Sequence, residues 1–279
     1  MTVNVVVQDR NGRLVTGLSR TDFELFDAGE PRAIADFRSE PAPISIAVLF
    51  DVSGSMDVAA KLSAARDAVK HLASWLEPGT DQVALFVFDT RLQELQSFTT
   101  EPAGVVRQLN SLRPFGSTSL YDAIAETGRQ LGERRGPRHA MVVVTDGADN
   151  GSRRSAREVS EIASAIDVPV YILAVVSPLD HPGTETAVNR APDSALTGPL
   201  NDLARWTGGA LFIASAPAHA SVAARQIVTE LRHDYLMTFE PSARAGWHPL
   251  VVRTHDTNLA VRARNGYVAG SRVGRHLQD

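Results

Sequence analysis

Two long apolar runs, Ile44–Phe50 and Ala140–Val144, lack the alternation of polar and apolar positions that a half-exposed strand shows. Such runs are typical of strands that are buried on both faces of a parallel sheet. Between residues 43 and 232 strand-like segments alternate with segments whose apolar residues recur at helical spacing, for example Ala60–Leu76. This alternation predicts an α/β domain with a doubly wound, mostly parallel sheet that helices cover on both faces.

The segment Arg91–Phe98 follows the strand Asp81–Phe88 after only a tight turn at Asp89 and Thr90. A parallel crossover needs a dozen or more residues, so these two strands must pair antiparallel. We therefore expect one antiparallel strand at the edge of a six-stranded sheet.

The two ends of the chain have a different pattern. Residues 1–42 and 233–270 contain strand-like segments separated by turns, with no helical period of any length. Each end alone supplies about three strands, and such small sheets are only marginally stable. We expect the two ends to pair as the halves of one β-sandwich into which residues 43–232 are inserted, followed by a tail over residues 271–279.

Polar residues stand where the buried strands end and in one further loop. They form a D-x-S-x-S motif, a threonine in a Gly- and Ser-containing loop, and a later aspartate: Asp51, Ser53, Ser55, Thr118 and Asp146. Ligands of open α/β sheets bind beyond the carboxyl ends of the strands, so these oxygens should meet there. They suit a hard cation, Mg2+ first with Mn2+ or Ca2+ as alternatives, and are poor ligands for zinc. The motif alone has another explanation, since Asp and Ser also favour turns and helix N-caps.

With these five positions in order, residues 43–232 resemble the von Willebrand factor A (VWA) family. The resemblance implies a metal-ion-dependent adhesion site (MIDAS), in which Thr118 and Asp146 bind the ion directly or through water. It also implies that an Asp or Glu side chain of a protein partner completes the coordination. In the implied sheet, the second strand lies between the first and the antiparallel edge, and the Asp146 strand lies on the other side of the first.

The flanks resemble those of a bacterial VWA-containing family first described from acidobacterial genomes. That family has G-L-x-x-x-D-F before the VWA domain and R-x-G-Y after it. The matching positions here are Gly17, Leu18, Asp22, Phe23, Arg264, Gly266 and Tyr267.

Composition narrows the classes of partner. The formal net charge is −4 and the charges are interspersed, which argues against nucleic acid as a partner. A short basic run, Arg134, Arg135 and Arg138, is expected to be a solvated turn.

Cysteine is absent, and no segment has the length and apolarity of a transmembrane helix. Because strand-like alternation begins at Thr2, we expect an extracytoplasmic protein, secreted, periplasmic or surface-bound, whose export signal is absent here.

These observations favour a metal-dependent protein-binding or adhesion module, with no catalytic residues. A Mg2+-dependent phosphoester hydrolase is one alternative, but it needs a general base or a cationic clamp, and the motif loops contain only Arg113. A metal that serves only as a structural staple is the other. No G-x-S-x-G, Walker A or G-x-G-x-x-G motif is present.

A long segment without a clear period separates the strand that ends near Val176 from the helix that begins near Pro199. Loops of this length are usually functional or disordered. A parallel strand would deliver the segment to the edge where Asp51 and Asp146 lie. We therefore expect it to contribute partner contacts through Asp180, His181, Glu185 and Arg190.

Overall fold

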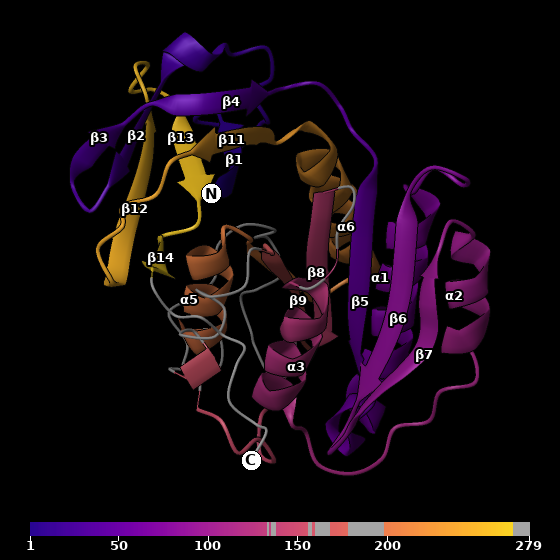
Figure 1. Ribbon diagram of the computed structural model, residues 1–279. Helices are drawn as coiled ribbons and strands as arrows, with labels where there is room; N and C mark the ends of the chain where they lie inside the picture. Colours follow the sequence, from indigo (N-terminus) through magenta and orange to yellow (C-terminus); the bar gives the residue numbers. More distant parts are fainter. Residues whose placement is uncertain (133, 135–137, 156–157, 160–167, 178–197, 270–279) are drawn as a thin grey trace.

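The computed structural model describes residues 1–132, 134, 138–155, 158–159, 168–177 and 198–269. A six-stranded sheet of order β10-β9-β8-β5-β6-β7 forms its centre (Figure 1). The strands are β5 (Ile44–Asp51), β6 (Gln82–Phe88), β7 (Leu92–Thr99), β8 (Arg138–Thr145), β9 (Val170–Val175) and β10 (Leu211–Ala214). Neighbours run parallel except β6 and β7, which pair antiparallel. The predicted mostly parallel sheet with one antiparallel edge strand is confirmed.

Helices cover both faces of this sheet because alternate residues of β5 point into different apolar layers. Ile46 and Val48 belong to a cluster with α1 and α6, whereas Ala47 and Leu49 belong to a second cluster with α3 and α5. The helices are the 3-10 helix η2 (Gly54–Ala60), α1 (Lys61–Ser74), α2 (Pro102–Leu109), α3 (Leu120–Gly132), α5 (Gly198–Thr207) and α6 (Pro217–His233). All residues of β5 are buried, which explains its unbroken apolar run.

The two ends of the chain form two further antiparallel sheets, of order β13-β1-β11-β4 and β14-β12-β2-β3. Their strands are β1 (Thr2–Gln8), β2 (Phe23–Asp27), β3 (Glu30–Arg32), β4 (Ile34–Arg38), β11 (Tyr235–Phe239), β12 (Gly246–Thr254), β13 (Ala260–Ala263) and β14 (Gly266–Ala269), with the 3-10 helix η1 (Arg20–Asp22) before β2. Both sheets combine strands from the two ends, and Val5, Leu25, Met237 and Val252 share one apolar cluster. That the flanks are one β-sandwich with an inserted domain stays a prediction.

Arg138, at the start of β8, joins the two connections between the flanking sheets and the central sheet. Its side chain is 5% exposed and its Nε lies 3.0 Å from Oδ1 of Asp234, which follows α6. Its two Nη groups donate to the carbonyl oxygens of Arg232, at 2.7 Å, and Glu40, at 3.4 Å. The two connections also touch directly, since the Ala42 amide donates to the Arg232 carbonyl oxygen.

The expectation that Arg138 lies in a solvated turn is therefore wrong. The sequence shows a basic run beside Gly136 and Pro137 but not the carboxylate that pairs with it, which lies 96 positions further along the chain (234 − 138). Burial raises the pKa of Asp234 to about 6, although Arg138 and a hydrogen bond from Asn4 favour the ionised form.

A chain that ends at Arg232 would lose β11 to β14, so β1 would lose both of its partner strands and β2 would keep only the short β3. Exposed apolar faces that include Val5, Val7 and Leu25 should then cause aggregation. Size-exclusion chromatography and urea unfolding of residues 1–232 measure this effect, with residues 1–269 as the control. A soluble, cooperatively folded 1–232 fragment would contradict the pairing as a requirement for stability.

Candidate functional site

Asp51 ends β5 at the carboxyl edge of the central sheet, and it is completely buried. Its Oδ1 accepts a hydrogen bond from the Ser53 amide at 2.8 Å, and its Oδ2 accepts one from the Thr145 hydroxyl at 2.6 Å. Burial raises the pKa of Asp51 to about 6; these hydrogen bonds lower it, and the nearby negative charge of Asp146 raises it. The carboxylate is thus held in a fixed orientation in a poorly solvated place.

Ser53 directly precedes η2, and Ser55 is the second residue of that helix. Their Oγ atoms lie 3.1 Å apart, so both hydroxyls face the same small volume. Ser53 is the N-cap residue of η2, but its side chain makes no capping hydrogen bond. The hydrogen bond from the Ser53 amide shows that Asp51 does order the turn that follows it, as the alternative explanation of the motif requires. The Ser53 hydroxyl also bonds to the Asp51 side chain, so the two serine hydroxyls form a short hydrogen-bonded chain that leads to this carboxylate.

The Thr118 loop is fastened to the loop after β5 by two backbone hydrogen bonds. The Phe115 amide donates to the Val52 carbonyl oxygen at 2.8 Å, and the Gly54 amide donates to the Gly116 carbonyl oxygen at 2.9 Å. A Cβ atom at Gly54 would lie 3.3 Å from that same Gly116 oxygen, a tight contact. The glycine of D-x-S-G-S therefore lets the two loops approach closely.

Thr118 is buried and lies between this loop pair and the loop that follows β8. Its amide donates to Oδ1 of Asn150 at 2.8 Å, and its carbonyl oxygen accepts from the amides of Asn150 and Gly151. A Cβ atom at Gly151 would lie 2.9 Å from Ser119 Oγ and 3.2 Å from the Thr118 oxygen. The third loop therefore holds Thr118 through main-chain contacts that tolerate little change.

Asp146 follows β8 directly, next to the Thr145 that contacts Asp51. Its Oδ1 accepts from the Ala148 amide at 3.2 Å, and its Oδ2 lies 3.1 Å from Nζ of Lys61 at the start of α1. Both side chains are largely shielded, with exposed fractions of 14% for Lys61 and 4% for Asp146. An ammonium group therefore stands beside one of the two candidate carboxylates.

Hydrogen bonds thus connect the three loops that carry the five predicted site residues at one edge of the sheet. Pattern analysis missed the residues that hold them there: Thr145, Asn150 and Lys61. Thr145 had a visible signal, because it is a polar residue at the end of an apolar strand. In the described part of the chain, no group of three or more His, Asp or Glu residues is placed to hold a metal. The predicted set has two carboxylates and relies on hydroxyl oxygens for the rest.

The segment that was expected to contact a partner is not described. Asp180, His181, Glu185 and Arg190 lie outside the described residues, so their role stays a prediction. The strand that precedes this segment is described: β9 ends at Val175 and runs parallel to β8, so it ends at the same edge of the sheet as β8.

Two large apolar side chains are exposed near the loops that carry the site. Phe115, whose amide is bonded to Val52, is 79% exposed, and Val58 in η2 is 58% exposed. Neither is buried by the described part of the chain, although each belongs to a segment anchored at the site. They add exposed apolar surface to the two segments that carry Thr118 and Ser55.

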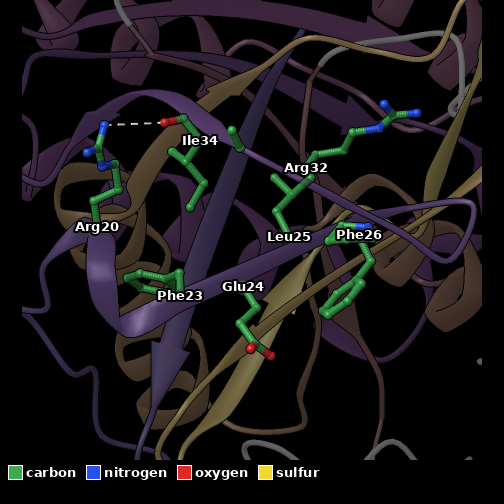
Figure 2. Close-up of a pocket in the computed structure, with 9 residues that line it drawn as sticks. Arg20, Phe23, Glu24, Leu25, Phe26, Arg32 and Ile34 are labelled. Atoms are coloured by element: carbon green, nitrogen blue, oxygen red, sulfur yellow. Dashed lines mark hydrogen bonds between the residues drawn. The ribbon is translucent and has the colours of Figure 1, made fainter.

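A surface pocket of about 440 Å3 is lined by η1, β2, β3 and the start of β4. Figure 2 shows the side chains that line it. It belongs to the flanking sheets and contains none of the predicted site residues. Its two guanidinium groups already have partners, since Arg20 donates to the Ile34 carbonyl oxygen at 3.4 Å and Arg32 lies 3.5 Å from Asp27. We therefore place the candidate site at the Asp51 edge.

Residues 46–148 match the family model of the von Willebrand factor type A domain. This match spans β5 to β8 and contains all five predicted site residues, so this part of the chain is a VWA domain. No curated protein sequence matches the chain. None of the helices in the described part is both long and apolar enough to cross a membrane.

Solved structures share the fold at low sequence identity. An aerotolerance-related membrane protein from Bacteroides fragilis NCTC 9343 is 20% identical, with a TM-score of 0.54 over 67% of this chain and 98% of that chain. The PilB minor pilin from Streptococcus sanguinis is 15% identical, with a TM-score of 0.53 over 70% and 63%. A von Willebrand factor type A structure from Catenulispora acidiphila is 14% identical, with a TM-score of 0.54 over 96% and 63%. This last similarity extends into the flanking sheets.

Thr145→Val should destabilise the protein by about 1–3 kcal/mol, because it leaves a buried oxygen of Asp51 without its donor and the Gly147 amide without its acceptor. Thr127→Val is the matched control. Thr127 is also fully buried, and its hydroxyl has no hydrogen-bond partner among the described residues. Its replacement should be neutral or stabilising. Urea unfolding at pH 7 measures both free energies, and equal losses would show that the bond to Asp51 is not what Thr145 contributes.

Proposed function

We propose that the VWA domain is a divalent-metal-dependent protein-binding module whose partner presents an Asp or Glu side chain. The observation that supports this best is the hydrogen bonding between the three loops, which gathers Asp51 and Asp146 with three hydroxyl groups at one sheet edge. Asp51, Ser53, Ser55, Thr118 and Asp146 would hold the ion, with Mg2+ as the first candidate and Mn2+ or Ca2+ as alternatives.

The donor set fits such an ion. All five donors are oxygens, which suits a hard cation, and two negative charges are buried close enough for one to raise the pKa of the other. A bound ion would supply an electrophilic centre that accepts a further carboxylate. The chain keeps its own ligands in position through the Thr145 hydroxyl and the Ser53 and Ala148 amides.

The surround of the site favours a protein as the partner. Phe115 and Val58 are exposed beside the polar edge, and apolar side chains around a charged contact are what a protein interface uses.

We also propose an extracytoplasmic location. It is supported by the fold shared with a Bacteroides fragilis membrane protein and a Streptococcus sanguinis minor pilin.

We further propose that the module is not an enzyme. Lys61, the cation beside the candidate ligands, is paired with Asp146, so it could act as a clamp on a phosphoester only if this ion pair were broken. Hydrolysis of p-nitrophenyl phosphate in the presence of Mg2+ would contradict this part of the proposal.

Asp51→Ala should lower the affinity for Mg2+ and Mn2+ by more than about 100-fold, because it removes one of two charged ligands, and loss of an outer-shell partner alone costs about 10–100-fold. Isothermal titration calorimetry measures this change. Asp67→Ala, which removes an exposed carboxylate of α1, should bind like the unmodified protein. Unchanged affinity in Asp51→Ala would exclude the assigned site.

Thr118→Ala, which removes one neutral ligand of the proposed ion, should weaken partner capture more than Mn2+ affinity. Phe115→Ala, which removes exposed apolar surface, should weaken partner capture several-fold while changing Mn2+ affinity little. Capture from envelope extracts of the source organism, with and without EDTA, measures partner binding. Capture that EDTA leaves unchanged would show that any partner binds elsewhere.

A further inference from the structure

Lys61 occupies an unusual place for a lysine. It is the first residue of α1, and its Nζ lies 3.1 Å from Oδ2 of Asp146, with most of the side chain shielded from water. The other oxygen of Asp146 is taken by the Ala148 amide at 3.2 Å. The ammonium therefore holds the oxygen that the backbone leaves available.

Helix energetics do not explain this placement. A cation in the first turn opposes the helix dipole, whose amino-terminal end is positive, and α1 has no acidic residue in that turn. The preceding residue, Ala60, adopts a left-handed conformation with φ of 61°, which is unfavourable for a residue with a side chain. The ion pair with the Asp146 carboxylate helps to offset the first of these costs, because it stabilises the ammonium at the start of the helix.

We propose that the Lys61 ammonium is a built-in counter-ion that neutralises Asp146 when the site is free, and that a divalent cation must displace it. This inference rests on the proposed metal site and specifies how its affinity is set. Asp51 and Asp146 carry two formal negative charges, and Lys61 returns one positive charge, which leaves −1 in place of −2. The metal-free protein is thereby stabilised, and the affinity for a divalent ion is lowered.

The consequence is a coupling between the site and the first turn of α1. Displacement of the ammonium breaks its contact with Asp146, so the side chain of Lys61 has to move when an ion binds. Lys61 directly follows η2, the helix that contains Ser55 and the exposed Val58, so this movement occurs at the end of a segment that also carries part of the site. Binding of an ion and the shape of the partner-binding edge are then linked.

Lys61→Met keeps the aliphatic stem and removes the charge, so it should raise the affinity for Mn2+ about tenfold in calorimetry. The same variant should be less stable than the unmodified protein in EDTA, because Asp146 loses its counter-ion, and should gain more stability on addition of Mn2+. Lys61→Arg keeps the charge and should bind Mn2+ like the unmodified protein. Lys70→Met is the matched control, since Lys70 lies on the same helix in an exposed pair with Asp67.

Equal or weaker Mn2+ binding by Lys61→Met, alongside normal binding by the unmodified protein, would overturn the counter-ion and leave the proposed function intact. Tighter binding by Lys70→Met as well would overturn it too, because the effect would then be one of general charge. Absence of Mn2+ binding in the unmodified protein, Lys61→Met and Lys61→Arg alike would overturn the proposed metal site and the counter-ion with it.

Discussion

The arrangement of the site depends on one constraint, a carboxylate at the end of a strand that has no exposed residue. β5 is buried along its whole length, so Asp51 enters the apolar interior of the sheet and must find hydrogen-bond donors there. It finds one in its own turn, from Ser53, and one on the neighbouring strand, from Thr145. The second bond joins β5 to the residue that precedes Asp146, and so fixes the two acids relative to each other.

Much of the central sheet could be predicted because burial on both faces leaves a direct trace in the sequence. The runs Ile44–Phe50 and Ala140–Val144 became β5 and β8, and the alternation of strands and helices predicted that they run parallel. Their direct pairing was implied by the resemblance to the VWA family. The same reasoning placed Asp51 and Asp146 at one edge. Lys61 and Asn150 were not predictable in this way, since their contacts depend on loop conformations that no periodicity encodes.

The strands of the two flanks were harder to predict from the sequence because they are short. Strands as short as β3 and β13 contain too few residues to show an alternation, so each end appeared to hold about three strands and holds four. The error over Arg138 has another cause. A charged residue beside a turn is usually solvated, and only the three-dimensional arrangement brings Asp234 to it.

The contacts of Arg138 limit how the central sheet can move relative to the flanking sheets. A domain that is joined by a single linker can rotate about it. Here two connections are hydrogen-bonded to each other, and the Arg138 guanidinium group donates hydrogen bonds to a carbonyl oxygen of each. Arg138 begins the strand whose other end leads into Asp146, with the flanking sheets near the first end and the site loops at the other (Figure 1). A twist of the site edge relative to the flanking sheets would therefore have to strain β8 or break the contacts of Arg138.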